Sequence, residues 1–474
     1  MEPGGGPEGV GATSPPSSAR GCGCDRARCG AAWRRLQPAP LPADSHRSPP
    51  SDPAPVATHA TCATRATADP VRVGILGTSW WIARMHLPAL ASHPGARLVA
   101  VAGRDAGRAG ALAERAAAAT GHPPRAYTSW QAMLADGALD AVIVATPDDL
   151  HAAMTCAALD AGAHVCCEKP LARTAADARA MWDAAEARGL LHMTYFTYRW
   201  LPHYRMARAV VAAGRLGRVR QLHVRFLSAM GRARGGGTIA PPPADPWRRD
   251  PRRSGGVLTD LGTHVADLVR VVAGGEIQRV AASVRADAPP AAPGDATSDA
   301  VLLLLEGVDA GGAAWHGTAH ATLGVAVGDR GLLQSLVVVG ERATLTVDVT
   351  IAGAELWLHR DGASEPLAIP EALGGALAHP FAAFERLPVG TRLFVDAVRA
   401  RRDGDAAAAR SLVASPEWAS FADGWAAQAV VDAAAASARE GRAIDVRPID
   451  VRAIDPPPIA APAPPPLTAD PVHR

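Results

Sequence analysis

Lysine is almost absent from this sequence. The 474 residues contain one lysine, Lys169, against 47 arginines. Aromatic residues make up only 4% of the chain, so aliphatic side chains and alanine must supply most of a core. The formal net charge of +2 gives no electrostatic case for binding nucleic acid or an anionic membrane. No run of 18 or more apolar residues occurs, so the sequence predicts no membrane span.

Cysteine is also scarce and irregularly spaced. The chain has seven cysteines, and this odd count without regular spacing argues against a disulfide framework. The segment GCGCDRARC, with Cys22, Cys24 and Cys29, could bind a metal. It lacks the paired CxxC spacing of zinc sites, so we expect no metal there.

The two ends of the chain lack a hydrophobic period. Residues 1–69 are rich in Pro, Gly, Ala, Ser and Arg, and residues 447–474 are rich in proline, so both are predicted to be disordered. Arg34 and Arg35 form a twin arginine, but no apolar segment follows them, so we expect no secretory or twin-arginine signal. A cytoplasmic protein is the corresponding expectation.

Residues 70–197 alternate short apolar runs with helical patterns. The predicted strands are VRVGILG (71–77), RLVAVAG (97–103), DAVIVAT (140–146), AHVCCE (163–168) and LHMTYF (191–196). Helical patterns such as 106–119 and 148–161 lie between them. Buried strands that alternate with helices predict an α/β domain with a doubly wound parallel sheet.

Residues 198–446 have a different pattern. A helix at about 201–213 precedes strand-like runs such as RVRQLHVRFLSA, AVLLLLEG and ATLTVDVTI, which follow one another with short turns. One helix (256–272) interrupts them early, and two helices (about 390–402 and 417–440) close the region. This predicts an α+β domain with an open, mainly antiparallel sheet. Ligands bind at the carboxyl ends of parallel strands, so we expect the site between the two domains.

The first predicted strand runs into a loop suited to phosphate. Gly77 occupies the tight-turn position of a dinucleotide loop, Ser79 the second glycine position, and Ile82 or Ala83 the third. The strict G-x-G-x-x-G pattern is therefore broken. A serine can still present its backbone N–H to a pyrophosphate, and the helix N-terminus supplies partial positive charge. An ordinary strand–turn–helix without a ligand is the alternative.

The end of the second strand bears on the cofactor type. An NAD-preferring fold usually has a carboxylate here for the ribose 2′-hydroxyl, and Gly103 takes that place. Arg104 follows and could pair with a 2′-phosphate, which favours NADP slightly. Asp105 could turn inward instead, or Arg104 could be a solvated turn residue.

Four motifs in one order carry a family resemblance. GTSWWIA, ATPDDLH, AGAHVCCEKPLA and GGVLTDLGTHVADL together resemble the Gfo/Idh/MocA family of NAD(P)-dependent oxidoreductases, over roughly residues 71–445. The resemblance implies a Rossmann domain followed by an open-sheet domain, a sugar, polyol or cyclitol substrate, and homo-oligomers built through the sheet face. Two departures from the family pattern are Ser79 and the bulky TSWW.

The resemblance also assigns residues. It implies a catalytic set of Lys169, Asp260 and His264, with the lysine at the reacting hydroxyl and the histidine as proton acceptor. The cofactor set is Gly77, Thr78, Ser79, Trp80, Trp81, Ile82, Arg104, Thr146, Pro147, His151, Glu168 and Lys169. The substrate set is Tyr198, Arg199, Trp247 and Arg248. Asp267 is expected to be structural.

The chemistry of hydride transfer suits these residue types. A hydroxyl proton must leave as the hydride leaves, and histidine is the natural base near neutral pH. Asp260 and His264 are four residues apart, so on one helix they share a face. Lys169 follows a strand end, and its ammonium would stabilise alkoxide character on the substrate oxygen. A buried helix histidine and a surface Lys–Glu pair are the alternatives.

Two other functions stay open at this point. Relatives of this fold include glycosidases that use bound NAD for transient oxidation. A dinucleotide-binding sensor without turnover would also fit the altered loop at Ser79. The sequence favours the dehydrogenase, because Lys169, Asp260 and His264 are all present.

Overall fold

The structure, a computed structural model, describes residues 69–228, 250, 253, 256–285, 299–323, 332–350, 352–375 and 389–446. Residues 1–68 and 447–474, which contain all but Asp69 of the predicted tails, lie outside these residues, and so do Cys22, Cys24 and Cys29. So do Trp247 and Arg248. Within the described ranges, no helix is both long enough and apolar enough to cross a bilayer.

A six-stranded parallel sheet forms the first half. Its strands are β1 (Val71–Leu76), β2 (Ala96–Ala102), β3 (Arg125–Tyr127), β4 (Ala141–Val144), β5 (His164–Glu168) and β6 (His192–Tyr195). They are ordered β3-β2-β1-β4-β5-β6, and each neighbouring pair is parallel. The strand order reverses between β1 and β4, and ligands of such sheets bind beyond the strand ends at that point. The predicted doubly wound sheet is confirmed.

Helices cover this sheet. They are α2 (Leu87–Ala91), α3 (Ala106–Thr120), α4 (Trp130–Ala135), α5 (His151–Asp160) and α6 (Ala175–Ala187), with short helical turns η2 (Ile82–His86), η3 (Asp148–Leu150) and η4 (Thr197–Trp200). Their ends follow local chemistry. Asp105 caps α3 by accepting the Arg108 N–H at 2.8 Å, and α3 ends at Gly121, whose φ of 73° suits glycine.

A nine-stranded sheet forms the second half. Its strands are β7 (Val219–Ser228), β8 (Gly275–Arg285), β9 (Ala300–Asp309), β10 (Ala314–Thr322), β11 (Leu332–Gly340), β12 (Thr344–Thr350), β13 (Gly353–Arg360), β14 (Ala363–Pro366) and β15 (Ile444–Asp445). The order is β14-β13-β12-β11-β7-β10-β9-β8-β15, and only β10 and β7 pair in parallel. Side chains of β9 alternate between buried and exposed, as in a sheet with one covered face. The open, mainly antiparallel sheet is confirmed.

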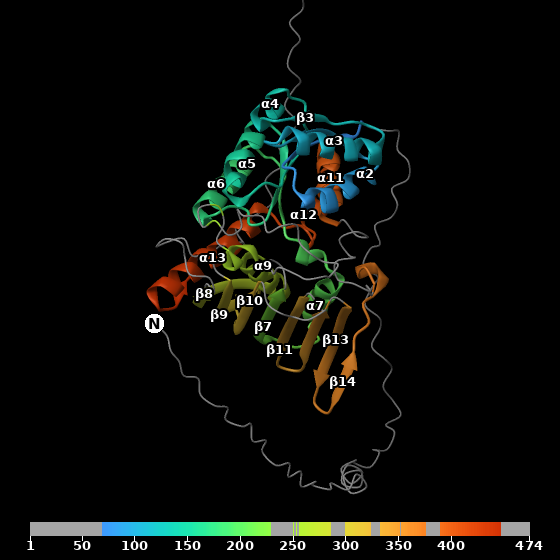
Figure 1. Cartoon of the computed structure of the whole chain (residues 1–474). Helices are drawn as coiled ribbons and strands as arrows, with labels where there is room; N and C mark the ends of the chain where they lie inside the picture. Colours follow the sequence, from blue (N-terminus) through green and yellow to red (C-terminus); the bar gives the residue numbers. More distant parts are fainter. Residues whose placement is uncertain are drawn as a thin grey trace, which may run out of the picture. The chain divides into compact units, whose positions relative to one another are not determined.

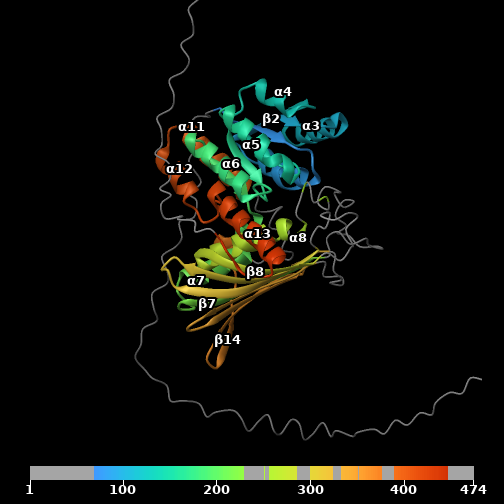
Figure 2. The ribbon, with the colours of Figure 1, turned by 90° about the vertical axis from the view of Figure 1, so that its left-hand side faces the viewer.

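Helices of the second half either cover one face of this sheet or return to the first half. They are α7 (Pro202–Ala212), α8 (Val257–Asp260), α9 (Gly262–Ala273), α11 (Val389–Arg402), α12 (Ala406–Val413) and α13 (Phe421–Glu440), with a short turn η7 (Glu371–Leu373). Figures 1 and 2 show α7, α9 and α13 on one side of the sheet. The last helix, α13, packs on β8 and also on α6 of the first half.

The chain end returns to the first sheet. Helix α11 packs against β1 and α2. Two polar contacts hold it there: the Thr391 hydroxyl lies 3.0 Å from Nδ1 of His86, and Oδ1 of Asp396 lies 3.0 Å from Nε2 of His93. Residues more than 300 positions apart in the sequence are therefore in contact beside the first sheet.

Candidate active site

The loop after β1 has the backbone that a close ligand requires. Gly77 has φ of +126°, and a Cβ there would lie 2.3 Å from the carbonyl oxygen of Ala145. A Cβ on Gly103 would lie 2.4 Å from Cγ2 of Thr78. Only glycine fits both positions, so the ends of β1, β2 and β4 approach one another without side chains between them. The N-terminus of a helix that follows such a loop is a place where phosphate groups bind in other proteins.

The helix after this loop begins with a π-helical turn. Residues Ile82–His86 form the turn, and α2 continues from it. Such turns are rare and recur at functional sites. Trp81 precedes the turn, and its Nε1 donates a hydrogen bond of 2.6 Å to Oε1 of Glu168. Trp80 packs edge-on against Trp81 and is 38% exposed, so the TSWW segment presents an indole to solvent beside the loop.

Thr146 lies just beyond the end of β4, in the turn predicted to cover the cofactor. Its Oγ1 is buried and has no hydrogen-bond partner among the described residues. A buried hydroxyl is normally bonded, so this oxygen has hydrogen-bonding capacity that a ligand group could use. Together with the glycine cradle at Gly77 and Gly103, it fits a dinucleotide. Pro147 continues the turn and is partly exposed.

Two charged side chains, Arg104 and Asp105, follow β2. Asp105 is the N-cap of α3, so its carboxylate is engaged with the Arg108 backbone. Arg104 is exposed at the end of β2. Of the two charged side chains at this strand end, the arginine therefore remains the candidate for contact with a ribose substituent.

Lys169 meets Asp260 across the two halves of the chain. The Nζ atom of Lys169, just after β5, forms an ion pair with Oδ1 of Asp260, the last residue of α8. It also donates a hydrogen bond of 3.1 Å to the Asp260 carbonyl. Both side chains are largely buried, with 14% and 10% exposed. Lys169 therefore lies where the domain of the six-stranded sheet meets the domain of the nine-stranded sheet.

His264 lies on α9, four residues after Asp260. Its ring stacks on Tyr198, with centroids 4.2 Å apart and planes inclined by 20°. The Tyr198 hydroxyl accepts a hydrogen bond of 3.1 Å from Gln334. Burial and the charge of Asp260 raise the pKa of Tyr198 to about 12, although the Gln334 bond acts to lower it. The phenol therefore stays protonated at neutral pH and forms a wall of the site.

Glu168 is anchored by a chain of hydrogen bonds that sequence reasoning did not anticipate. Its Oε1 accepts from Trp81 and lies 3.1 Å from Nε2 of His86, and its Oε2 accepts from the Lys169 backbone N–H at 3.2 Å. The Nδ1 atom of His86 lies 3.0 Å from the Thr391 hydroxyl, which Tyr195 also contacts at 2.9 Å. The His86 ring therefore links Glu168 to Thr391 of α11. In the sequence, the one sign of these bonds is His86 at the end of the turn η2. Its partner Thr391 lies over 300 residues away, so the contact could not be predicted.

Arg199 was expected to bind the substrate, but its side chain is bonded to other groups of the protein interior. It is buried, and its Nε and Nη2 donate to the carboxylate of Asp267 at 2.6–3.1 Å. Its Nη1 donates to the Trp418 carbonyl at 2.7 Å, and Asp423 lies 2.9 Å from Nη2. These bonds occupy all three nitrogens. We therefore assign Arg199, with Asp267, a structural role, whereas its neighbour Tyr198 does face His264.

Between β7 and α8 the structure describes only Asp250, Arg253 and Gly256. Arg253 binds Asp149 of η3 through two bonds, Nε to Oδ2 at 3.1 Å and Nη2 to Oδ1 at 3.0 Å. This bidentate pair joins the segment before α8 to the turn after β4. It holds the second half against the cofactor side of the first.

Sequence comparisons agree with this geometry. Residues 71–196 match the sequence model of an oxidoreductase family with an NAD-binding Rossmann fold, GFO_IDH_MocA, and residues 204–346 match its C-terminal domain. The chain is 34% identical over 153 residues to levoglucosan dehydrogenase of Pseudarthrobacter phenanthrenivorans, covering 31% of this chain and 36% of that protein. It is 36% identical over 203 residues to D-xylose 1-dehydrogenase (NADP(+)) 2 of Haloferax volcanii, covering 42% and 57%.

A solved structure extends the likeness to nearly the whole fold. An inositol dehydrogenase homolog complexed with NAD+ from Azotobacter vinelandii superposes with a TM-score of 0.65 at 27% identity. The superposition covers 80% of this chain and 98% of that one. By contrast, the matched segments span little more than half, or less, of the two curated relatives above.

Proposed function

This chain belongs to the Gfo/Idh/MocA oxidoreductase family, and on that premise we propose that it is an NAD(P)-dependent dehydrogenase or reductase acting on a sugar, polyol or cyclitol. Relatives named for levoglucosan, D-xylose and inositol support this substrate class. The observation that carries the proposal is the meeting of Lys169 and Asp260 beyond the end of β5. The bound nicotinamide would supply the hydride donor or acceptor.

The chain's own residues would handle the oxygen and its proton. The ammonium of Lys169 would bind the reacting oxygen and stabilise negative charge on it. The imidazole of His264 would accept or return the hydroxyl proton, the role for which histidine is suited. Asp260 would hold Lys169 between the end of β5 and α8, as the ion pair suggests. Tyr198 would support the His264 ring by stacking.

The cofactor would lie over the loop that begins at Gly77. The cradle at Gly77 and Gly103 and the buried hydroxyl of Thr146 support this placement. Thr78, Ser79, Trp80, Trp81 and Ile82 would line it, and Trp81 would link it to Glu168. We propose a slight preference for NADP, because Arg104 is exposed where a 2′-phosphate would lie and Asp105 is engaged as a helix cap.

Two measurements test the proposal. Quenching of tryptophan fluorescence by NADH and NADPH measures cofactor binding, and the chain offers 11 tryptophans, two of them beside the loop. A panel of cyclitols, aldoses and anhydrosugars is then screened for absorbance change at the nicotinamide band. Cofactor binding without turnover of any member would favour a sensor. Release of an aglycone from glycosides without net cofactor reduction would favour a glycosidase.

We also propose that the uncovered face of the nine-stranded sheet joins copies of this chain. Leu302 and Leu304 of β9 are 55% and 62% exposed on that face, and Trp357 of β13 is also exposed. Leu302 and Leu304 lie on the same side of β9, with only the buried Leu303 between them, and adjacent exposed apolar side chains often mark an interaction surface. Sedimentation of the wild type against the L302K/L304K variant tests the idea, because a lysine pair should dissociate the assembly. A wild type that is monomeric at micromolar concentration would exclude it.

A further inference from the structure

His151 has an unusual pair of neighbours. It is the first residue of α5 and has no solvent exposure. Its Nδ1 lies 2.7 Å from the Pro170 carbonyl oxygen, and its Nε2 lies 2.9 Å from the Thr146 carbonyl oxygen. Both distances are those of good hydrogen bonds. The ring therefore bridges the backbone after β4 to the backbone after β5.

The two carbonyls fix the protonation of the ring. A carbonyl oxygen only accepts, and a neutral imidazole has one N–H and one bare nitrogen. A neutral ring would point one lone pair at a buried carbonyl oxygen, whichever tautomer formed. Only the imidazolium donates on both sides. We propose that His151 is a positioning residue whose doubly protonated ring clamps Thr146 to Pro170 and so fixes the backbone from which Lys169 projects.

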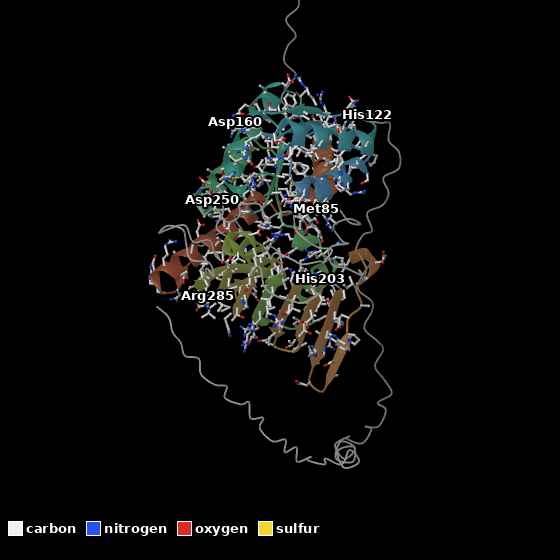
Figure 3. The ribbon with its side chains drawn as sticks, in the orientation of Figure 1. Met85, His122, Asp160, His203, Asp250 and Arg285 are labelled. Carbon is white, nitrogen blue, oxygen red and sulfur yellow. The ribbon has the colours of Figure 1, made fainter. Side chains whose placement is uncertain are left out.

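The charged surroundings of the ring agree with the geometry. Burial acts to lower the pKa of His151, but Cys167 on β5, the Asp148 carboxylate on η3 and the Pro170 carbonyl outweigh burial and raise it to about 10. Asp148 is itself buried, so its charge is little screened. His203 on α7, labelled in Figure 3, is the contrasting case. It is equally buried, and burial alone lowers its pKa to about 3.

The clamp lies between the two halves of the proposed site. On one side it holds Thr146, whose hydroxyl is free for a ligand among the described residues. On the other it holds Pro170, which directly follows Lys169. The charged His151 ring thus links Thr146, which is expected at the cofactor, to the backbone beside Lys169, which is expected at the substrate. The catalytic consequence rests on the proposed function, whereas the charge and the clamp do not.

Protonation can be read directly from the wild-type protein. Histidine labelled with ¹⁵N gives distinct signals for protonated and bare ring nitrogens, and H151Q and H203Q identify the two relevant rings. At pH 8 we expect His151 to show two protonated nitrogens and His203 to show one bare nitrogen. A bare nitrogen on His151 at pH 8 would overturn the proposal, even if the protein proved to be an active dehydrogenase.

Positioning can be read at the single lysine. Because Lys169 is the only lysine, protein grown with lysine labelled with ¹³C at Cε gives one side-chain signal. We expect H151Q to move or broaden that signal and H203Q to leave it at the wild-type position, with both variants folded by circular dichroism. If the signal is the same in all three proteins, His151 does not position Lys169. Should H151Q fail to fold, sequential assignment of the wild-type spectrum identifies the His151 ring instead, and its protonation still decides the charge.

Discussion

Lys169 and Asp260 form an ion pair between the end of β5 and the end of α8, 91 residues apart in the chain. The same ammonium donates to the Asp260 carbonyl, so a carboxylate and a backbone oxygen hold it from one side. An ammonium can turn its three donors among such partners, whereas a guanidinium is a flat, larger fork. A chain with 47 arginines keeps its one lysine at this point.

Replacing Lys169 tests whether this amine is needed for turnover. We expect Lys169→Ala to abolish turnover and leave NADH binding within a few-fold of wild type. Lys169→Arg should also fail, because the guanidinium cannot take the place of the ammonium against Asp260. Steady-state rates and fluorescence titration measure the two effects. Near-native turnover of either variant would show that the lysine is not catalytic.

His264 is expected to act as the general acid or base. His264→Ala should lower kcat by about 10²–10⁴-fold, the usual effect of losing such a group. The control is Tyr198→Phe, which keeps the stacked ring beside His264 and removes only the hydroxyl that Gln334 contacts. It should retain most activity. Equal losses in the two variants would indicate that packing, and not proton transfer, explains the effect.

Arg104 is expected to distinguish the two cofactors. Arg104→Ala removes an exposed guanidinium at the end of β2, where a 2′-phosphate would lie. Binding of NADPH should weaken about tenfold, and binding of NADH should change little. Fluorescence titration with both cofactors, at two salt concentrations, checks this. An equal change for both would remove the preference for NADP.

The buried pair of Arg199 and Asp267 should matter for stability. Asp267→Asn leaves the guanidinium without the carboxylate that it binds through Nε and Nη2, and should lower the free energy of unfolding by about 3 kcal/mol. The matched control is the exposed pair Arg179 and Asp183, where Asp183→Asn should cost about 0.5 kcal/mol or less. Urea unfolding measures both. Similar small effects would contradict the structural role of Arg199.

Glu417 should contribute to stability in a defined pH range. Burial acts to raise its pKa, but Arg208, a hydrogen bond from Ser415 and Arg205 outweigh burial and lower the pKa from 4.5 to about 2. A carboxylate with a lowered pKa stabilises the fold above its unfolded value, so this contribution is lost as the pH falls from 4.5 through 2. Wild type should therefore lose stability in this range more steeply than Glu417→Gln. Parallel curves would exclude the effect.

Much of the fold could be predicted because it depends on local patterns. Short apolar runs between helical segments predicted the parallel sheet, and successive alternating runs predicted the antiparallel one. Strand β3 was missed, since its three residues follow Pro123 and Pro124 and lie at the sheet edge. The predicted helix 256–272 consists of α8 and α9 with Leu261 between them. A three-residue edge strand and a one-residue helix break change the local hydrophobic pattern too little to be predicted from it.

The site was predictable only where motifs named the residues. The sequence motifs identified Lys169, Asp260 and His264 as candidate residues. They did not predict the ion pair between Lys169 and Asp260. Arg199 was misplaced because an arginine beside an aromatic residue looks the same whether it faces a ligand or a buried carboxylate. Two of the partners, Thr391 of α11 for His86 and the Trp418 carbonyl for Arg199, lie over 200 residues away. Such pairs are set by tertiary packing, and no local pattern contains them.

The return of α11 to β1 and α2 has a consequence for protein engineering. Thr391, Asp396 and the Trp418 carbonyl complete polar contacts that begin at His86, His93 and Arg199. A fragment that ends with the six-stranded sheet would expose these groups. We therefore do not expect the cofactor half to fold as an independent domain. Chimeras that exchange the substrate half between homologues should therefore keep residues 389–418 from the same parent as the six-stranded sheet.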